Sequence, residues 1–189
     1  MQTLGVRIWH ARVLTMFFST VAFALSTMAQ ITPSKNDNIS VGPATFGYKL
    51  VLSTTNRTFD VGKLVLMTVT LQNVATNVQE INSVEIYGLY HKVAIVGPNG
   101  KIIPPTQWGE GMLKSEGVIR HGRHKLKPGE SHSIKMPLNL LFQMSSPGEY
   151  TVRLSRRVFE HDNRSKKSWV TSEPLKIVLV EPTPEESQP

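Results

Sequence analysis

Residues 145–157 read SSPGEYTVRLSRR, a turn signal followed by a regular alternation of apolar and polar side chains. Pro147 and Gly148 favour a tight turn, because proline presets one backbone angle and glycine adopts angles that other residues avoid. Tyr150 and Val152 are spaced two apart, so they share one face of the strand that follows. The apolar run stops at arginines. The stretch predicts a strand with one buried face, and a role in folding rather than in catalysis for Tyr150.

The same alternation of apolar and polar residues recurs along the chain. It is found at residues 48–53, 65–72, 133–138 and 175–180. Turn residues separate these runs, and the sequence Gly97-Pro98-Asn99-Gly100 predicts a hairpin. Residues 138–144 favour one helical turn, and no other segment longer than two turns shows a helical period. About seven or eight short strands are therefore expected, which favours an all-β sandwich.

The pattern Ser146-x-Gly148-x-Tyr150-x-Val152 resembles the start of strand F in the immunoglobulin fold. In that family the tyrosine hydroxyl bonds back to the turn backbone and fixes the corner. Val152 stands where antibody domains have a cysteine, so the chain is similar to the disulfide-free relatives of that family.

A second pattern, Phe59-Asp60-Val61-Gly62 followed by Val69-x-Leu71-x-Asn73, resembles the start of strand B in bacterial immunoglobulin-like modules and in sandwich-type proteinase inhibitors. The resemblance covers residues 44–180 in outline. It implies a disulfide-free immunoglobulin-like sandwich of the bacterial exported type, with about seven or eight antiparallel strands. Adhesins, inhibitors, chaperones and carrier modules share this fold, so the fold does not name a function.

The two ends of the chain differ from its middle. Residues 1–29 combine early arginines, an apolar run of 13 residues at 13–25 and small residues before Gln30, which predicts a secretory signal peptide cleaved after Ala29. The alternative is a retained membrane anchor, although a span needs roughly 20 apolar residues. We expect a flexible N-terminal segment at 30–43, the immunoglobulin-like domain at 44–182 and a disordered acidic tail at 183–189. The predicted location is secreted or periplasmic, with no stable membrane span after cleavage.

The charge balance is basic, at +7 for the whole chain and +5 once Arg7 and Arg12 are removed with the leader. This balance favours a protein or an anionic polysaccharide as partner and makes nucleic acid a poor candidate for an exported chain. The chain has no cysteine, which excludes disulfides, thiolate metal sites and a cysteine nucleophile. Asn-x-Ser/Thr sites occur at Asn38, Asn56 and Asn163, and their glycosylation depends on the host.

Residues that could perform chemistry are sparse. His121, His124 and His132 are surrounded by basic residues, and strand geometry places the first two on opposite faces, so we expect no metal site. The chain lacks a Gly-x-Ser-x-Gly motif and a phosphate-binding glycine loop. An acid pair of Glu110 and Glu116 remains open, because nothing places them together. We therefore expect no catalytic residue, no cofactor and no enzymatic activity.

Two features are candidates for ligand binding. Trp108 lies in residues 104–117, a segment that we interpret as a long loop; its ring either stacks on a sugar or a partner, or folds back to cap the core. Two basic runs, 120–127 and 163–167, correspond to strand D with its following turn and to the F–G loop, which lie at one end of an immunoglobulin-like sandwich. They would form a basic rim of Arg123, Lys125, Lys127, Arg164, Lys166 and Lys167. The alternative is a pair of solvated edges that block aggregation.

These features predict an exported, non-enzymatic binding module that recognises a protein or an anionic glycan through its end loops. The alternative is a sandwich-type proteinase inhibitor that inserts the 104–117 loop into an enzyme cleft. A small hydrolase is a third and weaker hypothesis.

Overall fold

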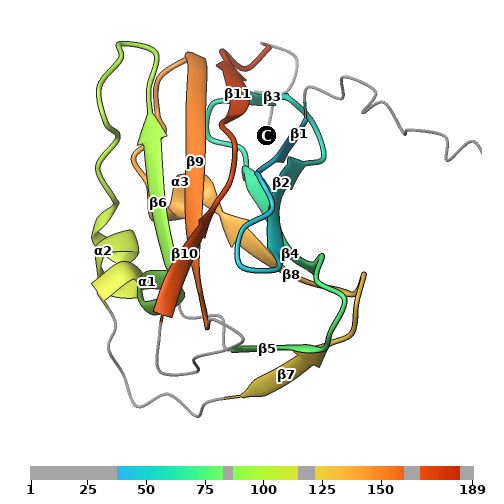
Figure 1. The fold of residues 1–189 in the computed structure, drawn as a ribbon. Coiled ribbons are helices and arrows are strands. Elements are labelled where there is room, and N and C mark those ends of the chain that lie inside the picture. Colours follow the sequence, from blue (N-terminus) through green and yellow to red (C-terminus); the bar gives the residue numbers. More distant parts are fainter. Residues whose placement is uncertain (1–37, 83–86, 115–121, 160–166, 184–189) are drawn as a thin grey trace, which may run out of the picture. The chain divides into compact units, whose positions relative to one another are not determined.

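The structure is a computed structural model that describes residues 38–82, 87–114, 122–159 and 167–183 (Figure 1). All of these belong to one compact unit, Lys35–Pro189. The predicted signal peptide and all but Thr183 of the predicted tail lie outside the described residues, as do Glu116, His121, Asn163, Arg164 and Lys166.

The first sheet is antiparallel and has four strands in the order β1-β2-β4-β8. They are β1 (Ile39–Val41), β2 (Tyr48–Thr54), β4 (Leu66–Asn73) and β8 (Ser131–Pro137). The last three follow the sequence alternation, with every second side chain of β2 and β4 buried. Strand β1 lies inside the segment 30–43 that was expected to be flexible, and it pairs with β2 from Ile39↔Ser53 to Val41↔Val51.

The second sheet is built around the long strand β9 (Gly148–Phe159). Strand β6 (His91–Val96) pairs antiparallel along one edge of β9. The other edge is shared by two consecutive strands, β10 (Lys167–Thr171) and β11 (Leu175–Val180). The short strand β3 (Thr58–Asp60) completes the sheet by pairing parallel to β11.

One apolar core is formed by residues from both sheets. Tyr48, Leu50 and Leu52 of β2 belong to the same buried cluster as Val152 and Leu154 of β9. Because strand side chains alternate, both sheets direct one face into this cluster. Each fully buried leucine or valine contributes roughly 1.5–3 kcal/mol relative to its exposed state. The fold is thus dominated by antiparallel β-structure and is compatible with a β-sandwich, as expected.

A two-stranded sheet stands apart from the two larger ones. It pairs β5 (Gln79–Asn82) with β7 (Arg123–Leu126), and we refer to these two strands as the β5–β7 ribbon. With this pair, the described residues contain eleven strands rather than seven or eight. The difference arises because strands of three to five residues, such as β1, β3 and β5, are too short to show an alternation that can be recognised in sequence.

Within the described residues, three short helices accompany the sheets: α1 (Tyr87–Tyr90), α2 (Gln107–Lys114) and α3 (Leu138–Leu141). Helix α3 confirms the helical turn expected at 138–144. Helix α2 corrects the interpretation of residues 104–117 as an irregular loop. Gly109, Met112 and Leu113 have helical spacing, and the glycine is buried while the other two pack on the core. Gly109 and Gly111 carry no apolar side chain, so residues 104–117 show no clear period in the sequence.

The Tyr150 hydroxyl bonds back to the turn before β9, as the resemblance implies. Tyr150 is buried, and its hydroxyl donates to the carbonyl oxygen of Ser146 at 2.7 Å while accepting from the Ser146 N–H at 3.2 Å. The hairpin at residues 97–100 is confirmed by the bond from the Gly97 N–H to the Lys101 oxygen at 2.9 Å. Among the helices of the described segments, none has the length and apolar character needed to cross a membrane.

Candidate functional site

The β5–β7 ribbon has one inward and one outward face. Gln79 faces Leu126 across the ribbon, and both are buried. Glu80 faces Lys125, and Asn82 faces Arg123, on the opposite face. The Arg123 Nη1 atom lies 3.3 Å from the Glu80 Oε1 atom, and its side chain is largely exposed. The outward face of β7 therefore presents basic side chains to solvent.

Asn73, at the end of β4, holds the ribbon to the first sheet. Its buried side-chain amide donates to the carbonyl oxygens of Asn77 at 2.8 Å and Leu126 at 2.9 Å. Its Oδ1 atom accepts the Ala75 N–H at 2.9 Å. A buried amide with its donor and acceptor satisfied fixes the backbone around it. Asn73 thus anchors both the segment that leads into β5 and the end of β7.

Two further donors reach the backbone of β5 from the two larger sheets. The Tyr48 hydroxyl of β2 lies 3.2 Å from the Glu80 carbonyl oxygen, and Arg156 Nη2 of β9 lies 3.1 Å from the Asn82 carbonyl oxygen. Carbonyls two residues apart lie on the same edge of a strand. Side chains rather than another strand therefore bond to this edge of β5.

Arg156 is the charged residue that sequence reasoning missed. It is only 3% exposed and continues the inward face of β9, after Tyr150, Val152 and Leu154. The buried His91 of β6 lies directly opposite it in the strand register. The sequence did contain a signal for its burial. Arg156 falls on the same face of the alternation as the apolar residues that precede it in the strand. The run of arginines was instead interpreted as the end of the buried face.

Burial dominates the titration of the tyrosines beside the ribbon. Desolvation raises the pKa of Tyr48 to about 12, while the Arg156 charge lowers it and the Glu80 charge raises it. Burial also raises the pKa of Tyr90, whose hydroxyl accepts a hydrogen bond from the Asn82 side-chain amide. Both hydroxyls therefore remain protonated at neutral pH, and that of Tyr48 acts as a donor to the ribbon.

Four of the six residues of the predicted basic rim lie in the described part of the chain. Arg123 and Lys125 are exposed on β7, Lys127 is exposed just after it, and Lys167 is the exposed first residue of β10. The pairing Val170↔Arg156, together with the bond from Arg156 to Asn82, connects β10 to the ribbon. Figure 1 shows the ribbon and the start of β10 at the same, lower part of the domain.

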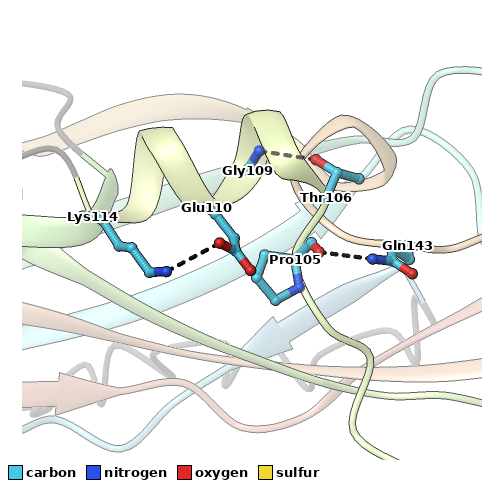
Figure 2. A network of polar contacts seen from close by, with 6 residues as sticks. All are labelled: Pro105, Thr106, Gly109, Glu110, Lys114 and Gln143. Carbon is cyan, nitrogen blue, oxygen red and sulfur yellow. Dashed lines mark hydrogen bonds and ion pairs between the residues drawn. The ribbon is translucent and has the colours of Figure 1, made fainter.

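Trp108 lies in the first turn of α2. Thr106 caps this helix, since its Oγ1 atom accepts the Gly109 N–H at 2.9 Å (Figure 2). The same hydroxyl donates to the Leu140 carbonyl oxygen at 2.5 Å. Gln143 bonds to the Pro105 oxygen at 3.0 Å, and Lys114 pairs with Glu110 at 3.0 Å. Trp108 is 50% exposed, so about half of its surface remains open to solvent.

The described histidines do not form a metal centre. The rings of His124 and His132 lie 5.8 Å apart between centroids. In the portion of the chain that the structure describes, no group of three or more histidine or carboxylate side chains is arranged to hold a metal ion.

Comparison with known proteins identifies no family for this chain. No family model and no curated protein matches the chain. Among solved structures, the chain is similar to a β-glucosidase from Listeria innocua in complex with isofagomine, with 10% identity and a TM-score of 0.34 over 70% of this chain and 16% of the other. The same enzyme in complex with glucose gives 10% identity and a TM-score of 0.32, again over 70% and 16%. Such low TM-scores carry no argument about fold or function.

Proposed function

We propose that the protein is an exported, non-enzymatic binding module whose basic rim takes an anionic partner, either an acidic protein or an anionic glycan. The supporting observation is the β5–β7 ribbon. Its outward face carries Arg123 and Lys125, while its backbone is fixed by Asn73, Tyr48 and Arg156. Rigid presentation lowers the ordering cost of binding, so charges on such a ribbon bind better than charges on a mobile loop.

The proposed fold of the module is the immunoglobulin-like sandwich. The neighbours β2-β4-β8 correspond to strands A, B and E of that fold, and the neighbours β6-β9-β11 correspond to C, F and G. The Tyr150 corner supports the same assignment. With this assignment the ribbon, which precedes strand E, and the start of β10, which follows strand F, belong to connections at one end of the sandwich.

The alternative of a sandwich-type proteinase inhibitor receives less support. It requires residues 104–117 to be extended and exposed, whereas residues 107–114 form α2. Helix α2 packs against α1 and α3. A helix does not fit an enzyme cleft that binds extended peptide.

Export is part of the proposal and rests on residues 1–29. Intact-mass measurement of the protein from its native host should give a chain that begins at Gln30. Recovery of residues 1–29 attached to the protein in a membrane fraction would contradict it.

Heparin, as a model anionic polysaccharide, tests the basic rim. Replacing Lys125 and Lys127 by glutamine, or Lys167 alone, should weaken binding, by about tenfold for the double variant, and the wild-type affinity should fall steeply with salt. Lys101→Gln is the matched control for the single Lys167 variant, because Lys101 is exposed and follows the hairpin turn after the last residue of β6. Lys176 is a poorer control, since it pairs with Glu149 at 2.8 Å. Equal losses at rim and control positions would show that only net charge matters.

A further inference from the structure

The turn that leads into β2 has an unusual residue at its tip. Thr45 and Tyr48 exchange backbone hydrogen bonds of 2.8 and 2.9 Å, which closes a two-residue hairpin. Both central residues have left-handed backbone angles, with φ of +53° at Phe46 and +79° at Gly47. Asparagine or glycine normally fills the first position of such a turn, because a bulky side chain is strained there.

Burial does not explain why a phenylalanine occupies this position. Phe46 is 44% exposed, so nearly half of its surface stays in contact with solvent and gains nothing from folding. Phe46 departs from the preference for asparagine or glycine at this turn position, and its packing does not explain the departure. Such positions are frequent at binding sites, where the strain is maintained because the side chain is used.

Two other exposed apolar side chains lie beside the turn. Val74 is 42% exposed and Val78 is 47% exposed. The Val74 N–H bonds to the Gly47 oxygen at 2.9 Å, which holds Val74 against the turn. Gln79, the neighbour of Val78, lies so close that a Cβ placed on Gly47 would be 2.8 Å from its amide nitrogen. We refer to Phe46, Val74 and Val78, three exposed apolar residues brought near one another by these backbone and neighbour contacts, as the apolar patch.

Backbone pairing links the segments that carry the apolar patch to the segment that carries Lys125 and Lys127. Gln79 pairs with Leu126, and Leu126 stands between Lys125 and Lys127. Asn73, the residue before Val74, donates to the Leu126 oxygen at 2.9 Å. Lys125 of β7, Lys127 just after it and the exposed valines are therefore connected through hydrogen-bonded backbone.

We propose that the partner of this surface is a protein segment that presents an apolar side chain to the apolar patch and carboxylates to Lys125 and Lys127. This inference rests on the proposed function and narrows its partner class. An anionic glycan would use the lysines but gain little from aliphatic valines, whereas protein interfaces combine an apolar centre with a charged rim. An anionic membrane is the competing occupant that the experiment must separate.

The test uses the mature chain with two synthetic peptides, measured by fluorescence anisotropy. One peptide carries a phenylalanine flanked on each side by glutamates, and the other replaces that phenylalanine with serine. Wild type should bind the first at least about tenfold more tightly than the second, the range expected when a buried apolar side chain is lost from an interface. Phe46→Asn should abolish this preference while the protein remains at least as thermostable, because asparagine relieves the strained turn. Heparin binding should stay unchanged in Phe46→Asn.

The outcomes separate the inference from the function on which it rests. Equal binding of the two peptides, with heparin binding still dependent on Lys125 and Lys127, would overturn the inference and leave the proposed function standing. If replacing Lys125 and Lys127 changed neither heparin binding nor peptide binding, the proposed function itself would be overturned. Vesicles of phosphatidylglycerol and phosphatidylcholine that bind wild type but not Phe46→Asn, together with equal binding of the peptides, would replace the protein segment by a membrane surface.

Discussion

At the scale of single residues, Tyr150 shows what one hydroxyl does for the fold. Its hydrogen bonds to Ser146 connect strand β9 to the turn before it, and the ring is buried in the core. Tyr150→Phe keeps the ring and removes only the hydroxyl. We expect the fold to persist and the free energy of unfolding to fall by about 1–2 kcal/mol, the cost of a lost hydrogen bond with a stranded partner. Urea unfolding measures this, and an unchanged midpoint would show that the corner does not need the bond.

Tyr48 should make the protein sensitive to alkaline pH. Its pKa of about 12 in the folded state exceeds the ordinary value of 10.0, so the folded state holds this proton more firmly than the unfolded state does. The stabilising effect is complete below the unfolded pKa and is lost as pH rises from about 10 to about 12. A shift of this size corresponds to about 2–3 kcal/mol.

The comparison for this prediction is Tyr48→Phe, which has no hydroxyl to ionise. Wild type should lose more stability than the variant between about pH 9 and about pH 11.5, because only wild type has the Tyr48 hydroxyl. The lysines lose their charge in both proteins, so their effect cancels in the comparison. Parallel decreases in urea-unfolding experiments at the two pH values would contradict the role given to Tyr48.

At the scale of elements, the alternation of side chains predicted strands where it ran for six residues or more. The strands β2, β4, β8 and β11 match it closely. Helix α2 was not predicted, because it contacts α3 at Gly109, and this close contact requires a residue without a side chain. A pattern of apolar residues cannot register a contact made by a missing Cβ. Strand β1 was not predicted either, because three residues are too few to show an alternation and the strand is formed by its pairing with β2.

The two glycines of α2 give a matched pair of substitutions. A Cβ on Gly109 would overlap the Leu141 carbonyl oxygen of α3, whereas a Cβ on Gly111 meets nothing within 4 Å. Gly109→Ala should therefore destabilise the protein by about 1–3 kcal/mol through overpacking. Gly111→Ala should stabilise it by about 0.5–1 kcal/mol, because alanine is the better helix former. Thermal unfolding of both variants checks the prediction, and effects of equal sign would show that α2 does not pack on α3 at Gly109.

At the scale of the whole molecule, the ribbon is held by residues from both large sheets, and this could not be predicted from sequence. The Asn82 oxygen that accepts from Arg156 lies 74 positions away in the chain. The alternation in β9 places Arg156 on the inward face, but charged residues are rarely buried without a partner, and the sequence does not show that this partner is the Asn82 oxygen. The basic runs themselves were visible, because charge is a property of composition and needs no tertiary contact.

Arg156 therefore offers a test of how the interior supports the basic rim. Arg156→Met fills much of the same volume but removes the donor to the Asn82 oxygen, so one edge carbonyl of β5 loses its partner. Amide hydrogen exchange at residues 79–82 and 123–126 should accelerate by about tenfold, while β11 keeps its protection. Heparin affinity should also fall, although the buried Arg156 cannot touch a ligand, because a loosened ribbon presents Arg123 and Lys125 less rigidly.

The control for this test is Arg153→Met, which removes an exposed charge from the outer face of the same strand. It changes the net charge equally and leaves the ribbon untouched. If both variants leave exchange in the ribbon at the wild-type rate, Arg156 does not hold it. If both lower heparin affinity to the same extent, long-range charge rather than ribbon rigidity governs binding. Faster exchange and weaker binding in Arg156→Met alone would connect a buried guanidinium in β9 to a surface formed by a different pair of strands.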